Sequence, residues 1–137
     1  MEKIFKALVL TSFILFVVWW HFGYLEPFLT DDPDTLSFWD SVGFDAKFTF
    51  PNWYGHLWFV FWVVAYGGLF FLHRPMRTVF VTGYLVSFVT TPFHGSVIES
   101  PWSSIVGDLN TLLDGAILGL AFLSSVAKKF GRERAVE

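Results

Sequence analysis

The chain has 137 residues, of which 54% are hydrophobic, 21% aromatic and 15% charged, and its mean hydropathy is +0.54. Soluble domains carry about 25% charged residues, and one of this length could not cover so much apolar surface, so we expect an integral membrane protein. The formal charge of −3 gives no sign of nucleic-acid binding, and the absence of cysteine excludes thiol nucleophiles, thiolate metal sites and disulfide redox chemistry.

Four apolar runs are long enough to cross a bilayer, whose hydrocarbon core of about 30 Å takes about 20 helical residues. They cover approximately residues 4–25, 53–72, 78–98 and 105–126. We therefore predict that residues 1–137 form one domain, an all-α bundle of four transmembrane helices. The first run is longer than the apolar part of a cleaved signal peptide, and no Ala-x-Ala site follows it, so we expect it to be retained.

The basic residues predict the orientation of these spans, because Lys and Arg accumulate in cytoplasmic segments. Eight of the nine lie before or at the start of the first run, between the second and third, or after the fourth. Both termini are therefore expected in the cytoplasm. Six of the seven Trp residues would then lie near the outer face, at the headgroup level that Trp favours.

The loop between the first two runs, residues 26–52, is acidic and is expected outside, with six carboxylates against the single Lys47. Asp32 is suited to cap a helix and Pro33 to occupy its first position, while Gly43 is suited to end it. Apolar residues recur at helical spacing between these points, so we predict a short amphipathic helix on the outer surface. The spacing of the acids does not fit a calcium-binding loop.

Small residues predict how the helices pack, because membrane helices associate where their backbones can approach closely. The third and fourth runs each carry a small residue at every fourth position. Those of the third run are Gly83, Ser87, Thr91 and Gly95, and those of the fourth are Gly107, Thr111, Gly115 and Gly119. Because a short outer turn joins the two runs, we expect the two rows to pack against each other.

Asp114 lies about ten residues into the fourth run, close to the expected midplane of the bilayer. An ionised carboxylate there costs several kcal/mol unless it is paired, protonated or next to water. Asn110 lies one helical turn away on the same side. Further polar residues come from the outer parts of the second to fourth runs, and the candidate intramembrane cluster therefore comprises Asp114, Asn110, Asp108, His94, Glu99 and His56.

Two interpretations of this cluster stay open. Carboxylate and imidazole groups at different depths would suit a proton or cation relay. Alternatively, a protonated Asp114 donates to Thr or backbone acceptors on the third run and fixes helix pairing. A haem would need two axial histidines at matching depth, for which His56 and His94 are the one reasonable pair, and no metal-binding pattern occurs within one helix. We expect neither a cofactor nor a metal.

Two short segments resemble known groups of membrane proteins. LLDGAILGLAFLS at residues 112–124, with FLHRPMR at residues 71–77, resembles small four-span bacterial inner-membrane proteins to which no activity is attached. VGDLNTLLD at residues 106–114 is similar to the Gly-x-x-Asn-Thr-x-x-Asp stretch of GtrA-like four-span proteins, thought to move lipid-linked sugars. There the stretch belongs to the first helix and here to the last, so no residue role is carried over.

These patterns favour a non-enzymatic protein of a bacterial inner membrane that acts through helix–helix contacts. It would be an accessory subunit of a membrane complex or an immunity-type protector, with the lipid bilayer and a membrane protein or a second copy as partners. No hydrolase or transferase motif occurs. The first alternative is a small oligomeric transporter or flippase-like permease that uses Asp114, and the second is a haem- or quinone-linked subunit.

Overall fold

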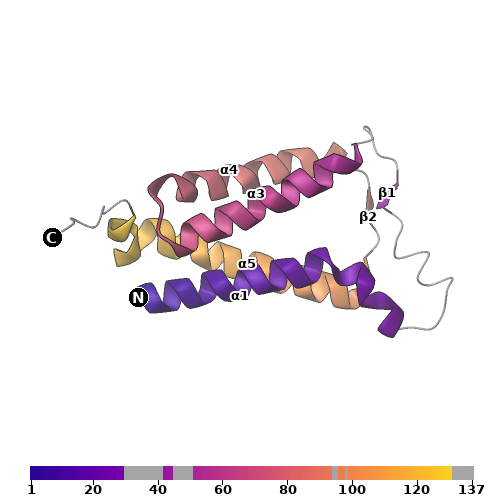
Figure 1. Ribbon diagram of the computed structural model, residues 1–137, viewed down its shortest axis with the longest axis horizontal. Coiled ribbons are helices and arrows are strands. Elements are labelled where there is room, and N and C mark those ends of the chain that lie inside the picture. Colours follow the sequence, from indigo (N-terminus) through magenta and orange to yellow (C-terminus); the bar gives the residue numbers. More distant parts are fainter. Residues whose placement is uncertain (30–41, 45–50, 94–95, 98, 131–137) are drawn as a thin grey trace.

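The computed structural model describes residues 1–29, 42–44, 51–93, 96–97 and 99–130, and within them the chain is almost entirely helical. The long helices are α1 (Glu2–Trp20), α3 (Asn52–Phe70), α4 (Arg74–Thr90) and α5 (Pro101–Leu123), and they lie alongside one another as an elongated bundle (Figure 1). Short 3-10 turns extend them, namely η1 (Phe22–Tyr24), η2 (Glu26–Phe28), η3 (Thr91–Phe93) and η4 (Ser125–Lys129).

The turn between α3 and α4 is shorter than the sequence predicts. Leu72 adopts a φ of 60°, in the left-handed region, and this reverses the chain within three residues. Pro75 lies in the first turn of α4, where its missing N–H costs nothing, so the helix already begins at Arg74. Residues 73–77, which separate the second and third predicted runs, are therefore mostly the first turn of α4.

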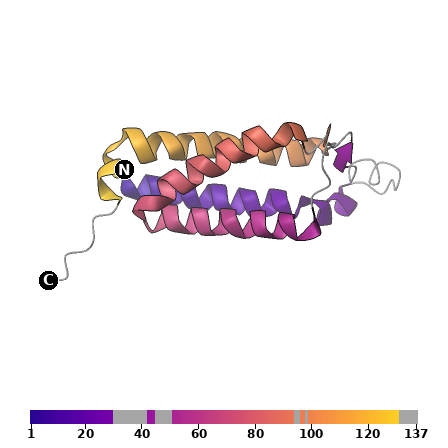
Figure 2. The same ribbon diagram turned by 90° about the horizontal axis from the view of Figure 1, so that it is seen from above.

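A small antiparallel pairing lies at the opposite end of the bundle from the N-terminus (Figures 1 and 2). It joins β1 (Val42–Phe44) to β2 (Ser96–Val97), with Val42 opposite Val97 and Phe44 opposite Ser96. Most of the predicted amphipathic helix lies outside the described residues. Its predicted end at Gly43 is wrong, because the backbone there is extended and pairs with the connection between α4 and α5.

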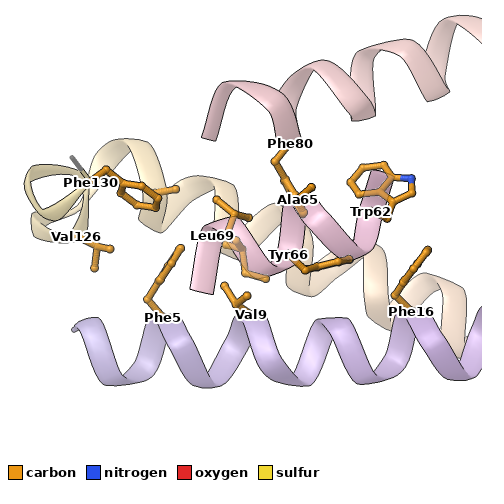
Figure 3. Close-up of a cluster of buried hydrophobic side chains, with 12 residues drawn as sticks. Phe5, Val9, Phe16, Trp62, Ala65, Tyr66, Leu69, Phe80, Val126 and Phe130 are labelled. Carbon is orange, nitrogen blue, oxygen red and sulfur yellow. The ribbon is translucent and has the colours of Figure 1, made fainter. Parts of the chain in front are cut away.

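The core lies between α1, α3 and α5, and α4 packs onto α3 (Figures 2 and 3). α1 makes its most extensive contact with α5. The buried apolar residues are Phe5, Val9, Phe16, Trp62, Ala65, Tyr66, Leu69, Phe80, Ile117, Ala121, Val126 and Phe130. Aromatic edges meet aromatic faces here, with the Trp62 ring centroid 5.3 Å from that of Phe80 and 4.9 Å from that of Tyr84. Such pairs favour one packing arrangement over others.

Gly83 and Gly107, one from each row of small residues, do not face each other. A Cβ added to Gly83 would lie 2.6 Å from Cε1 of Phe61, so this glycine faces α3. A Cβ added to Gly107 would lie 3.0 Å from Nε1 of Trp19, so this one faces α1. The expectation that the third and fourth runs pack through their rows is therefore wrong, and the close approaches join other helix pairs.

The remaining members of the rows lie mainly at the surface. Thr91, Thr111 and Gly115 are exposed, whereas Ser87 and Gly119 are partly buried and Gly95 lies outside the described residues. The row of α5 faces away from the core because the opposite side of this helix carries its buried residues. These are Ser103, Asn110, Asp114, Ile117 and Ala121.

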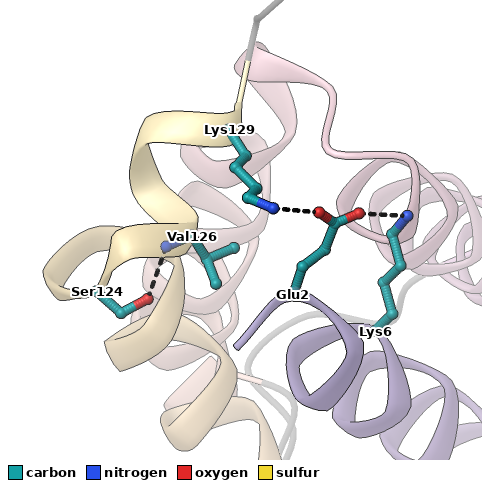
Figure 4. A network of polar contacts seen from close by, with 5 residues as sticks. All are labelled: Glu2, Lys6, Ser124, Val126 and Lys129. Atoms are coloured by element: carbon teal, nitrogen blue, oxygen red, sulfur yellow. Dashed lines mark hydrogen bonds and ion pairs between the residues drawn. The ribbon is translucent and has the colours of Figure 1, made fainter.

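Polar contacts close the end of the bundle that carries the N-terminus (Figure 4). The carboxylate of Glu2 lies 2.9 Å from Nζ of Lys6 and 2.6 Å from Nζ of Lys129, which joins α1 to η4. Nη1 of Arg77 donates to the backbone oxygen of Ala121 at 3.2 Å, which joins α4 to the last turn of α5. Exposed ion pairs contribute little stability, so these contacts chiefly fix where the helix ends lie.

Two helices, α1 and α5, are long and apolar enough to cross a membrane, by length and composition alone. α3 has 19 residues and α4 has 17. Large apolar side chains are exposed on all four of these helices, among them Leu10, Val60, Leu85 and Leu112.

Candidate functional site

Asp114 is a buried carboxylate in the middle of the bundle, and its side chain is 1% exposed. It belongs to α5, on the same side as Asn110 one turn before it and Ile117 one turn after it. All three are buried because this side faces the other helices. The sequence predicts this inward direction for Asp114 and Asn110, and the structure agrees.

Each of the other three helices supplies one hydroxyl group to Asp114. The Tyr66 hydroxyl of α3 donates to Oδ2 at 2.7 Å, and the Tyr84 hydroxyl of α4 donates to the same oxygen. Oγ of Ser12 in α1 lies 2.5 Å from Oδ1. Asn110 adds a bond from within α5, because its Nδ2 donates to Oδ2 at 3.1 Å. One carboxylate thus joins all four helices.

The residues around Asp114 also contact one another. Oγ of Ser12 lies 3.0 Å from Oδ1 of Asn110, and Nδ2 of Asn110 lies 3.4 Å from the Tyr66 hydroxyl. We call Ser12, Tyr66, Tyr84, Asn110 and Asp114 the Asp114 cluster. All except Tyr84 are buried, and Tyr84 is partly buried. Water has little access to this set, so its polar atoms depend on one another for hydrogen bonds.

Among the described residues, no cation pairs with Asp114 to balance the charge that it would carry when ionised. Within the part of the chain that the structure describes, the ion pairs are those of Glu2 with Lys6 and Lys129, at one end of the bundle. The neighbours of the Asp114 cluster are aromatic, since the Tyr66 ring lies 5.2 Å from Phe80 and the Tyr84 ring 4.9 Å from Trp62. The hydrogen-bond partners of Asp114 among the described residues are therefore all neutral groups.

Three of the predicted cluster residues that the structure describes do not join Asp114 and Asn110. His56, Glu99 and Asp108 are exposed, and His94 lies outside the described residues. A ladder of carboxylate and imidazole groups leading to Asp114 is thus absent from the part of the chain that is described. The predicted polar cluster reduces to Asp114 and Asn110.

Sequence reasoning missed Ser12, Tyr66 and Tyr84. Each is a polar residue well inside an apolar helix, and this is the signal that could have identified it. Tyrosine also favours the headgroup level, however, and a lone serine is well tolerated in an apolar helix. Only the packing of four helices shows that the three hydroxyls converge on one carboxylate.

Among the described residues, no group of three or more His, Cys, Asp or Glu side chains is arranged to hold an ion. A cavity of about 350 Å³ lies elsewhere, between η1, η2 and the first turns of α5, and is lined by apolar residues such as Phe22, Trp102 and Ile105. Polar substrates would find no partner there.

Comparisons with family models, with curated proteins and with solved structures found no match for this chain. The resemblances to four-span bacterial proteins and to GtrA-like proteins therefore stay predictions. The hydrogen bonds of the Asp114 cluster hold the four long helices together around a buried acid, and they need no further partner. Two features bear on the function, namely the Asp114 cluster and the exposed apolar side chains of the four long helices.

Proposed function

We propose that this protein is a four-span integral membrane protein that acts through helix–helix contact with another membrane protein. It would serve as an accessory subunit or as an immunity-type protector in a bacterial inner membrane. Support comes from the exposed surface, where all four helices carry large apolar side chains that water would not tolerate in such number. Helices with apolar exteriors and polar contacts inside suit a lipid environment.

The orientation that we propose places both termini in the cytoplasm. The N-terminus, the α3–α4 turn and η4 lie at one end of the bundle (Figure 1). The basic residues of these segments within the described part are Lys3, Lys6, Arg74, Arg77, Lys128 and Lys129. Trp19, Trp53 and Trp102 belong to helix ends on the opposite side, as expected for an outer interface.

Reporter fusions test this orientation. A reporter that is active only in the cytoplasm should be active when fused after Glu137 and inactive when inserted at Asp34, because basic ends stay inside. A reporter active only outside should give the reverse pattern. Activity of the outside reporter after Glu137 would contradict the proposed orientation.

The observation that carries the proposed function is an outward-facing pair of glycines on α5. Gly115 and Gly119 are four residues apart, and a Cβ added to either would meet nothing within 4 Å among the described residues. In an apolar helix this spacing lets a second helix approach closely, and it is typical of transmembrane helix association. Glycines contribute little packing against lipid, so their position favours a partner helix on this face.

Two neighbours make the same side of α5 suited to a protein partner. Leu112 is 71% exposed and lies one turn before the glycines, where it can pack beside an approaching helix. Asp108, a further turn away, is exposed and has no hydrogen bond or ion pair within the described residues. A carboxylate on an otherwise apolar surface is better satisfied by donors of a partner than by lipid. We call Asp108, Leu112, Gly115 and Gly119 the α5 outer face.

Cysteine crosslinking tests this face, and the chain suits the method because it has no native cysteine. Leu112→Cys should crosslink to a neighbouring membrane protein in intact membranes when it carries a thiol-reactive label with a short photoactivated group, which reacts with any residue close by. Val60→Cys is the matched control, because Val60 is 54% exposed on another helix, α3. Equal crosslinking at both positions, or none at Leu112, would contradict the proposed function. Crosslinking to a second copy would identify the partner as this chain.

A transporter that uses Asp114 gains no comparable support. Asp114 is enclosed at 1% exposure, and the 350 Å³ cavity is apolar and lined by other residues. Passage of an ion or a sugar would require the four helices to separate around Asp114. The closed geometry favours a structural role for Asp114 and an interaction role for the surface.

A further inference from the structure

The Asp114 cluster has fewer hydrogens than its contacts require. Oγ of Ser12 lies 2.5 Å from Oδ1 of Asp114 and 3.0 Å from Oδ1 of Asn110. Both neighbours are acceptors when Asp114 is ionised, but a serine hydroxyl carries a single hydrogen. The Tyr66 and Tyr84 hydroxyls and Nδ2 of Asn110 are already directed at Oδ2 of Asp114. With an ionised Asp114, one of the two contacts of Ser12 therefore joins two oxygens with no hydrogen between them.

Exchanging the oxygen and nitrogen of the Asn110 amide does not supply the missing hydrogen. Oxygen and nitrogen of an amide are assigned from their surroundings, so both orientations have to be considered. In the reversed orientation the amide nitrogen faces Ser12 and satisfies it. The amide oxygen then lies 3.1 Å from Oδ2 of Asp114, where two acceptors would again face each other. Either orientation leaves one contact without a hydrogen.

We propose that the Asp114 cluster is a proton-binding site, and that Asp114 holds the missing hydrogen as a neutral carboxylic acid. With the amide as observed, Oδ1 of Asp114 donates to Ser12 and Ser12 donates to Asn110. Oδ2 keeps its role as acceptor for Tyr66 and Tyr84. A separation of 2.5 Å suits a carboxyl group bonded to a hydroxyl.

The surroundings of the site agree with a bound proton. The titratable groups that face Asp114 are Tyr66 from α3 and Tyr84 from α4, while α1 contributes Ser12 and α5 contributes Asn110. None of these groups is a cation that would stabilise a carboxylate. Loss of the proton would leave an unbalanced charge and an unsatisfied contact at the point where all four helices meet. Closure of the bundle is therefore coupled to binding of one proton.

This inference goes beyond the proposed function, because it concerns the interior of the bundle and not the α5 outer face. It would stand if no partner protein were found. The two are also tested by different readouts, since the proton is observed on Asp114 itself and the partner by crosslinking at Leu112. Failure of one experiment is thus distinguishable from failure of the other.

Infrared spectroscopy of the full-length protein in lipid vesicles tests the proton directly. Protein labelled with ¹³C at the aspartate carboxyl should show, at neutral pH, an isotope-shifted C=O band of a protonated acid. This band should be absent from Asp114→Asn and retained in Asp108→Asn, the matched control on the same helix. A labelled wild-type protein with carboxylate bands alone would overturn the inference, and this comparison needs no variant to fold.

Stability gives a second, independent readout. Asp114→Asn should keep its unfolding equilibrium constant within about threefold of the wild type, because a neutral amide can donate to Ser12 and accept from the tyrosines. The wild type should lose stability as the pH rises from neutral to alkaline, because the folded state binds one more proton than the unfolded state. Asp114→Asn should lose this pH dependence. A variant that fails to fold, or a wild type indifferent to alkaline pH, would count against the bound proton.

Discussion

Replacing Asp114 by Leu is expected to destabilise the bundle, because it removes the acceptor that joins the four long helices. The side chain would keep a similar size but remove the acceptor for the Tyr66 and Tyr84 hydroxyls and the partner of Ser12. A buried hydroxyl left without a partner costs about 1–3 kcal/mol, and hydrogen bonds between membrane helices contribute about 0.6–2 kcal/mol each. We therefore expect the free energy of unfolding to fall by on the order of 2–4 kcal/mol.

Reversible unfolding of the purified protein in mixed micelles measures this loss. Asp108→Leu is the matched control, since it makes the same substitution on the same helix at an exposed position without described hydrogen bonds. Asp108→Leu should leave the free energy of unfolding within about 0.5 kcal/mol of the wild type. If both variants unfolded alike, Asp114 would not be the residue that holds the four helices together.

The long helices could be predicted from the sequence because length and hydropathy are properties of contiguous residues. The observed α1, α3 and α5 overlap most of the predicted runs, although each begins one to four residues earlier. α4 begins at Arg74, four residues before the predicted start, because charged residues and Pro75 look like a turn but are well accepted in the first turn of a helix. The end of a helix depends on which residues its first and last turns accept, and mean hydropathy does not report this.

The Asp114 cluster could be predicted only in part. The inward direction of Asp114 and Asn110 follows from their separation along one helix, together with the cost of exposing a carboxylate. Whether Ser12, Tyr66 and Tyr84 contact Asp114 depends on the relative rotation and depth of the four helices. Those quantities are set by packing between segments far apart in the chain, and a single sequence does not display them.

The rows of small residues also show that a single sequence does not display which helices pack together. A small residue at every fourth position predicts a surface that allows close approach, but it does not name the partner. Gly83 meets Phe61 of α3 and Gly107 meets Trp19 of α1, whereas Gly115 and Gly119 meet nothing among the described residues. The row of small residues on α5 therefore contacts α1 at Gly107, near the start of the helix, and faces outward at Gly115 and Gly119.

Replacing Gly115 by Ile is expected to disrupt association through the α5 outer face without unfolding the bundle. The Cβ of the new side chain meets open space in the isolated chain, so the internal packing has room for it. A partner helix that approaches closely at Gly115 would be displaced by the branched side chain. We expect affinity for the partner to fall at least about tenfold, which corresponds to about 1.4 kcal/mol.

Gly67→Ile on α3 is the matched control, because a Cβ added there also meets nothing within 4 Å among the described residues. Both substitutions replace a helical glycine by the same residue, so their effects on helix propensity cancel in the comparison. Co-purification in mild detergent and crosslinking from Leu112→Cys would report association, and unfolding in mixed micelles would report stability. Loss of association in Gly115→Ile alone, with both variants folded, is the expected result. Equal association of the two variants would show that the outward glycines do not bind a partner.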